Sequence, residues 1–314
     1  MSFEKMAKIK IRTFRFLLII WHYIISVRAE GPSADYCFLQ CKDRVDSIHK
    51  VCKRLHRCNV NTNKCKEYNI DENFRKKILD LHNKARNELA NGDVRGSYGN
   101  TGAKNMNALS YDLELEYFSS CVANDCKTLN KLDGCLNSQR FPAHASSAMI
   151  YNAKFGDSFW NDAMNDIKSS MNYIGSVNYI HGFNYEAASD DLSFYNLYWA
   201  DAKYVGCTAI LYKSSDKTGI LQCTYAPVEY KEGSPVYKMA TSTSEIASEC
   251  REGKNKDYSS LCGVVQPIPK GKMWTLLNST NDNNLSKKMY SISFFTITMV
   301  SLSLIFLLKY FINT

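Results

Sequence analysis

The sequence contains no paired CxxC knuckle, although it has 12 cysteines, all of them between Cys37 and Cys262. The closely spaced pairs, Cys37/Cys41 and Cys121/Cys126, are too wide or too isolated to form a zinc ribbon or finger. An even number of cysteines confined to the middle of a chain is typical of a disulfide framework. The cysteines therefore exclude a zinc finger and indicate an oxidising compartment.

The middle of the chain also lacks a basic excess. The whole sequence has a net charge of +8, with 39 Lys and Arg against 31 Asp and Glu. Seven of these basic residues and one acid lie in residues 1–29 and 289–314, which leaves 32 basic and 30 acidic residues between them. A nucleic-acid-binding domain would keep its positive charge within the folded part. No nucleic-acid partner is therefore expected.

The first 29 residues have the three-part layout of a signal peptide. A basic segment precedes an apolar stretch of 12 residues, 16–27, which is too short to span a bilayer comfortably. Val27 and Ala29 place small side chains at positions −3 and −1 of a cleavage site before Glu30. We expect an extracellular or cell-surface protein; the alternative reading of this segment is an uncleaved membrane anchor.

A second apolar run, residues 289–308, has 20 residues without a charge, which is long enough to cross a membrane as a helix. The polar stretch before it carries glycosylation sequons at Asn278 and Asn284. This layout fits either a single-pass helix or a removable GPI signal. Lys309 and the polar end of the chain suit a GPI tail poorly, and positive-inside support for the helix is weak. Both anchors remain open, with the helix slightly favoured.

Apolar residues at helical spacing predict three helices. The first begins after Asp71, whose side chain can cap it, and ends at Gly92. Ser110 can cap the second, and the third contains Trp160 and continues to Ile174.

The later part of the chain changes to strand-like patterns. Residues 194–199, 205–212 and 220–225 are short, aromatic and β-branched, which favours strands, and residues 213–219 resemble a hairpin loop. Residues 91–107 are rich in Gly and Asn and are expected to form a long loop. Helices followed by a small antiparallel sheet predict an α+β fold in one domain of roughly 200 residues.

Several short motifs follow one another in the order of a known family. The most specific is ILDLHNKAR followed by ANG, in residues 78–92. The others are ANDC at 123–126, Trp199 followed by VGC at 205–207, and CTY at 223–225 with PVY at 235–237. By these motifs the chain resembles the CAP superfamily, and by its early and late cysteine spacings the insect antigen 5 or venom-allergen group within it. The resemblance implies a three-layer α-β-α sandwich.

The resemblance and the composition together divide the chain into successive segments. These are a signal peptide (1–29), a cysteine-rich and irregular N-terminal extension (30–68), the CAP domain (69–229), a cysteine-containing C-terminal extension (230–266), a polar stalk (267–288), the apolar anchor segment (289–308) and a short tail (309–314).

The resemblance also implies a disulfide pairing. The pairs it implies are Cys37–Cys52, Cys41–Cys135, Cys65–Cys126, Cys207–Cys223 and Cys250–Cys262, which leaves Cys58 with Cys121. Cys58 and Cys65 could exchange their partners.

Many members of this family hold two His and two Glu in a central cleft that can bind zinc. The resemblance places Leu132, Ser146, Ala163 and Ser193 at those four positions. None of these is a metal-binding side chain, so no metal, cofactor or catalytic residue is expected. Asp162 does not replace Ala163, because one step along a helix turns the side chain by about 100°.

Neighbouring residues offer one alternative site. Asp133, His144, His181 and Asp191 carry ligand-type side chains near the vacant positions. In the family, residues at the positions of His82, Asn83 and Arg86 pack and form hydrogen bonds across the sandwich, so a structural role is expected for these three.

The function expected from these observations is a non-enzymatic, extracellular, membrane-tethered binding module in a secretory or reproductive tissue. Its partner would be an unknown extracellular protein or lipid. A sterol or fatty-acid carrier is the first alternative, because the family includes such proteins, and a metal-dependent hydrolase is the second.

Overall fold

The computed structural model describes residues 36–39, 48–53, 58, 64–93, 102–123, 126, 135–150, 158–163, 165, 183, 194–213 and 219–271. The chain divides into two compact units, Met1–Asp35 and Tyr36–Thr314, and every described residue belongs to the second. The predicted signal peptide, both sequons and the apolar run 289–308 lie outside the described residues. Within those described ranges, no helix is both long enough and apolar enough to cross a membrane.

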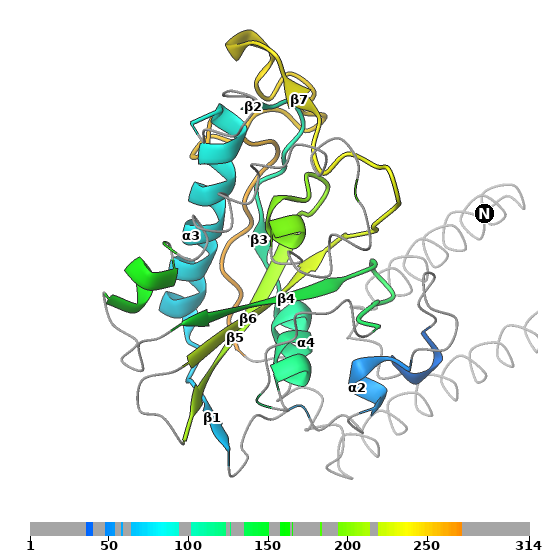
Figure 1. Cartoon of the computed structure of the whole chain (residues 1–314), viewed down its shortest axis with the longest axis vertical. Coiled ribbons are helices and arrows are strands. Elements are labelled where there is room, and N and C mark those ends of the chain that lie inside the picture. Colours follow the sequence, from blue (N-terminus) through cyan, green and yellow to red (C-terminus); the bar gives the residue numbers. More distant parts are fainter. Residues whose placement is uncertain are drawn as a thin grey trace, which may run out of the picture. The chain divides into compact units, whose positions relative to one another are not determined.

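A five-stranded sheet forms the centre of the described unit (Figure 1). Its strands are β1 (Cys65–Glu67), β3 (Ser110–Tyr111), β4 (His144–Ile150), β5 (Tyr204–Tyr212) and β6 (Gly219–Ala226). The order is β1-β5-β6-β4, with antiparallel neighbours, and β3 pairs with β5 in parallel. A separate pair joins β2 (Gly102–Ala103) to β7 (Met239–Ala240). Every residue of β6 is buried, as expected for a central strand that is covered on both faces.

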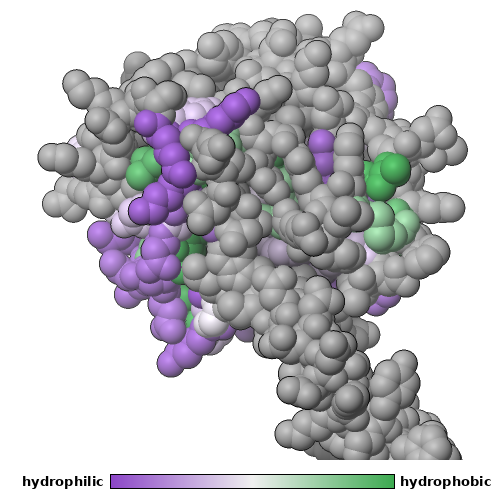
Figure 2. All heavy atoms as spheres, turned by 90° about the horizontal axis from the view of Figure 1, so that it is seen from below, coloured by the Kyte–Doolittle hydropathy of each residue, from purple (hydrophilic) through white to green (hydrophobic). Residues whose placement is uncertain are grey.

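Helix α3 (Glu72–Asn91) matches the first helix predicted from the sequence. The Asp71 carboxylate accepts a hydrogen bond of 2.7 Å from the Phe74 amide, and Gly92 ends the helix with a left-handed φ of 81°. Its apolar stripe is buried together with Arg75, His82, Asn83 and Arg86, and its other polar residues are exposed or half-buried. On the face seen in Figure 2, hydrophilic side chains dominate the described surface and apolar ones show only in small separate areas.

Helix α4 (Leu113–Ala123) begins later than the sequence predicts. Its cap is Asp112, whose Oδ1 accepts hydrogen bonds from the amides of Glu114 and Leu115, both at 3.0 Å. The prediction that Ser110 caps this helix is wrong, because Ser110 lies in β3 and its Oγ accepts a hydrogen bond from the Gln266 amide. Parallel pairing with β5 holds this residue in a strand.

Helices α3 and α4 cover opposite faces of the sheet, as successive residues of β6 show (Figure 1). Thr224 Oγ1 lies 2.9 Å from Ser119 Oγ of α4, whereas the next hydroxyl, that of Tyr225, lies 2.9 Å from His82 Nε2 of α3. Because neighbouring side chains on a strand point to opposite faces, the sheet is the middle of three layers. The predicted α+β, three-layer sandwich is confirmed.

The run FYNLYW was predicted to be a strand, and this prediction is wrong. Residues 194–198 are helical, and every residue from 194 to 200 is buried. A short run that is apolar on all sides fits a buried helix as well as a buried strand, so periodicity could not separate the two. The sequence analysis also missed β4 and the short strands β1, β2 and β7.

The cysteine-rich N-terminal extension packs onto α4. It contributes a 3-10 turn, η1 (Tyr36–Phe38), the short helix α2 (Lys50–Lys53) and strand β1. The Tyr36 ring stacks on His49 with centroids 4.9 Å apart and meets Phe118 of α4 edge-on at 5.3 Å. The prediction of an irregular extension therefore missed real elements, one of which belongs to the main sheet.

Candidate functional site

Two of the four positions that the resemblance assigns to the family's metal-binding cleft lie in the described part of the chain. Ala163, assigned to a carboxylate position of the family, lies in the helical residues 158–163 and is 1% exposed. Ser146 lies in β4, where its backbone pairs with Cys223 of β6. Leu132 and Ser193 lie outside the described residues.

Of the alternative ligand set, the structure describes only His144. Its ring lies 4.6 Å from the Tyr230 ring, which in turn stacks on Phe183 at 4.3 Å with the planes nearly parallel. Trp199 meets Tyr230 edge-on at 5.1 Å. Asp133, His181 and Asp191 lie outside the described residues. What surrounds His144 in the described part is aromatic packing, which does not itself provide metal ligands.

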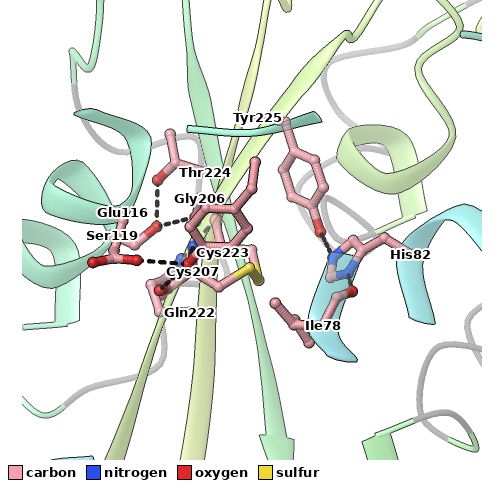
Figure 3. Close-up of a disulfide and its surroundings, with 11 residues drawn as sticks. Ile78, His82, Glu116, Ser119, Gly206, Cys207, Gln222, Cys223, Thr224 and Tyr225 are labelled. Atoms are coloured by element: carbon pink, nitrogen blue, oxygen red, sulfur yellow. Dashed lines mark hydrogen bonds between the residues drawn. A yellow bond between two sulfur atoms is a disulfide. The ribbon is translucent and has the colours of Figure 1, made fainter. Parts of the chain in front are cut away.

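His82 is buried, and both of its ring nitrogens have partners (Figure 3). Nδ1 lies 2.7 Å from the Ile78 carbonyl oxygen, which can only accept, so Nδ1 carries the proton. Nε2 then accepts a hydrogen bond of 2.9 Å from the Tyr225 hydroxyl. Burial lowers the pKa of His82 to about 4, so its imidazole is neutral at physiological pH.

Among the described residues, one group of three side chains brings potential metal-ligand atoms close together. It consists of His82, Cys207 and Cys223. The two cysteines are directly opposite each other on β5 and β6 and are joined in a disulfide (Figure 3). A disulfide has no thiolate to bind a metal, and the His82 lone pair is already engaged by Tyr225. This group is therefore a structural cross-link beside a satisfied histidine.

Arg86 is fully buried and is surrounded by carbonyl oxygens. Its guanidinium donates to the carbonyls of Asn107 at 2.8 and 2.9 Å, Leu197 at 2.5 Å and Trp199 at 3.2 Å. Burial lowers its pKa to about 10. Asn83 exchanges two hydrogen bonds with the backbone of Leu109. The structural role expected for His82, Asn83 and Arg86 is confirmed, because each side chain forms hydrogen bonds between α3 and a segment packed against it.

A second polar network ties the N-terminal extension to the domain. The Tyr36 hydroxyl donates to Glu114 Oε1 at 2.9 Å, and burial raises the pKa of this hydroxyl. Arg140 donates to the other oxygen of Glu114, at 2.5 and 2.9 Å, and to both carboxylate oxygens of Asp112, each at 2.9 Å. Each of these hydrogen bonds joins residues 26 or more positions apart, so no local pattern in the sequence could predict the network.

The disulfides reinforce the same connections. The structure joins Cys37 to Cys52, Cys58 to Cys121, Cys65 to Cys126, Cys207 to Cys223 and Cys250 to Cys262. These pairs match those implied by the resemblance, without an exchange between Cys58 and Cys65. Cys135 is also disulfide-bonded, and Cys41 lies outside the described residues.

A groove of about 940 Å³, lined in part by Trp199 and Tyr230, lies beside the buried groups above, and the sequence analysis missed it. Residues 199–203, 227–238 and 249–252 supply most of its lining, together with Asn105 and Asn107. Charged side chains dominate it: Asp201, Glu229, Glu249, Glu252, Lys203, Lys231, Lys238 and Arg251. Segments far apart in the sequence meet there, and the only local signal is the density of charges in residues 229–232 and 249–256.

The chain is similar to several curated arthropod proteins. It is 27% identical over 265 residues to venom allergen 5 of the scorpion Tityus serrulatus, covering 80% of this chain and 60% of that protein. It is 28% identical to scoloptoxin SSD552 of Scolopendra dehaani, covering 62% and 85%. It is also 28% identical to venom allergen 5 of Polybia scutellaris rioplatensis, covering 64% and 98%. The chain thus spans less than two thirds of the length of the Tityus protein.

Among solved structures, the chain is similar to BmVAL-1, with 21% identity, a TM-score of 0.47 and coverage of 61% of this chain and 94% of that one. A family model matches residues 79–225, the span from α3 to the end of β6, under the description cysteine-rich secretory protein family. Residues 79–225 therefore form a domain of the cysteine-rich secretory protein (CAP) family.

Proposed function

We propose that this CAP protein is a non-enzymatic binding module that works outside the cell. The observation that carries the proposal is the buried methyl group of Ala163, a residue that the resemblance assigns to a cleft carboxylate position of the family. A metal-dependent hydrolase needs ligands for the metal and a group that moves a proton in an open cleft. A buried methyl group can supply neither.

The buried polar groups support the same conclusion. The imidazole of His82 has partners at both nitrogens, and the Arg86 guanidinium is bound by backbone carbonyls. Groups that act on a substrate must reach it, whereas these two are about 1% exposed or less. They stabilise a shape, and a stable shape held by disulfides is what an extracellular binding module requires.

Two measurements on purified protein test the absence of catalysis. After washing with a chelator and dialysis against zinc, elemental analysis should find substoichiometric zinc, and a panel of fluorogenic peptides should remain uncleaved. The variant Ser193→Ala should behave identically in both assays. Stoichiometric zinc, or peptide cleavage that Ser193→Ala abolishes, would overturn the proposal.

The lipid-carrier alternative has less support. A carrier of sterols or fatty acids needs a mainly apolar cavity, whereas charged and amide residues make up half of the lining of the groove in the described part. Mass spectrometry of an organic extract of the purified protein should find no lipid at stoichiometric amounts. A sterol or fatty acid that copurifies at one molecule per chain would favour the carrier instead.

Secretion and tethering complete the proposal. The basic and apolar segments of residues 1–29 support entry into the secretory pathway, and the uncharged run 289–308 supports an anchor. On expressing cells, the protein should be labelled by a membrane-impermeant reagent. Release by a phosphatidylinositol-specific phospholipase C would identify a GPI anchor, and retention would identify a spanning helix. Complete release into the medium without the enzyme would contradict a tether.

A further inference from the structure

The charged groove is built on a rigid frame. On one side, the Ala200 amide donates to the Val236 carbonyl at 2.9 Å and the Lys203 amide donates to the Ala226 carbonyl at 2.8 Å. On the other side, the Glu249 amide donates to the Lys104 carbonyl at 2.9 Å, next to the disulfide of Cys250. A groove whose walls are fixed before binding loses less conformational entropy when a ligand enters.

Two ion pairs join the walls of the groove. Lys203 lies 2.6 Å from Glu252, and Lys238 pairs with Glu249. The first pair connects the CAP domain to the C-terminal extension, and the second connects two parts of that extension that lie before and after β7 (Figure 1). These four charges therefore neutralise one another and hold the groove in shape.

Three other charged residues of the lining are exposed, and their side chains make no hydrogen bond or ion pair within the described part of the chain. They are Asp201, Lys231 and Arg251. Their charges have different signs, and all three line the same groove. A ligand that carries both an acidic and a basic group would satisfy them at once, which would give specificity as well as affinity.

The overall charge of the lining excludes some ligand classes. Its four acidic and four basic side chains sum to zero. A sulfated glycan or another polyanion would meet the basic groups but would also be repelled by carboxylates, so the balance disfavours it. The volume of about 940 Å³ lies near the upper end of ordinary ligand pockets, about 300–1,000 Å³, and so leaves room for a short peptide segment.

We propose that this groove binds an extended peptide segment of an extracellular protein, with acidic residues placed at Lys231 and Arg251 and a basic residue placed at Asp201. The inference rests on the proposed binding function and names the class of its partner. Of the positions that the resemblance assigns to the family's metal cleft, the two in the described part, Ser146 and Ala163, do not line the groove.

A random dodecapeptide library displayed on phage tests the inference with the full-length protein purified in detergent. Enriched sequences should contain both acidic and basic residues. Synthetic copies labelled with a fluorophore should bind with an affinity that falls as salt is added. The double variant Lys231→Gln/Arg251→Gln should weaken binding by about tenfold or more, since each 1.4 kcal/mol corresponds to tenfold. Asp201→Asn should weaken the binding of those peptides that carry a basic residue.

The matched control is Lys256→Gln, which removes an exposed lysine of the C-terminal extension that does not line the groove. It should leave peptide affinity unchanged, and all variants should keep the melting temperature of the parent. The inference is overturned if no peptide is enriched, if the groove variants bind as well as Lys256→Gln does, or if heparin binds more tightly than any peptide. The proposed function is overturned by stoichiometric zinc or by peptide cleavage, and none of the three results above is of that kind. The failure of the peptide site is therefore distinguishable from the failure of the proposed function.

Discussion

The Arg75 guanidinium and the Glu116 carboxylate form a bidentate ion pair between α3 and α4, with N–O distances of 2.7 and 2.9 Å. Their side chains are 2% and 9% exposed. Arg75 also donates to the carbonyl oxygens of Pro269 and Gly271 at 2.9 and 2.7 Å. One guanidinium therefore connects both outer layers of the sandwich with the last described stretch of chain.

Removing one partner of this pair should be much worse than removing both. Glu116→Leu leaves a buried guanidinium without its counter-ion, which typically costs about 3–5 kcal/mol of unfolding free energy. The double variant Arg75→Met/Glu116→Leu replaces the pair by apolar groups and should recover a large part of that loss. Urea unfolding followed by circular dichroism measures both. Equal losses in the single and double variants would show that the charge left behind is not the cause.

The parts of this structure that the sequence predicted are those with a local signal. Asp71 and Gly92 mark the ends of α3 because capping and left-handed termination each depend on one residue beside the helix. The buried run around Tyr198 was assigned to the wrong element because its burial on every side erases the periodicity. Ser110 was assigned as a cap because a strand of two residues has no pattern of its own.

The candidate site shows the same division. The family motifs are short and continuous, so resemblance could assign Leu132 and Ala163 to cleft positions, and that assignment stays a prediction. The Arg75–Glu116 pair spans 41 positions, and the two walls of the charged groove are brought together only by the fold. Neither could be predicted, because contacts between distant residues depend on the packing of the layers.

His82 should make the protein less stable in mild acid. Its pKa in the folded state is lowered to about 4 by burial, whereas an unfolded histidine has a pKa of about 6.5. Between these values the unfolded chain binds a proton that the folded chain does not, so stability falls as the pH drops from about 6.5 to 4. The loss should reach about 3 kcal/mol.

Urea unfolding at successive pH values, compared with His82→Gln, isolates this contribution. The variant should be less stable at pH 7, because it alters the hydrogen bonds to Ile78 and Tyr225. Its stability should depend less on pH across the window from 6.5 to 4. An identical pH dependence in the two proteins would assign the effect to other groups.

Arg86→Lys should destabilise the protein although the charge is kept. The planar guanidinium reaches the carbonyls of Asn107, Leu197 and Trp199 together, and an ammonium group cannot satisfy all three in the same geometry. We expect a loss of about 2–4 kcal/mol. Thermal unfolding compared with Lys84→Met provides the control, since Lys84 forms an exposed ion pair with Asp80 on the same helix and should contribute less than about 1 kcal/mol.

Gly206 allows β5 to approach α4 closely, so even the methyl group of an alanine should not fit at this position. A Cβ at this position would lie 2.1 Å from the Glu116 amide nitrogen and 2.5 Å from the Asp112 carbonyl oxygen, and backbone atoms cannot move aside without shifting the helix. Gly206→Ala should therefore lower the yield of folded protein sharply, or lower its melting temperature by about 10 °C or more. Gly233→Ala is the control, because nothing lies within 4 Å of its Cβ and only its φ of 76° is unfavourable, which costs about 1–2 kcal/mol. If the two variants had the same melting temperature, β5 and α4 would be able to move apart more easily than these distances imply.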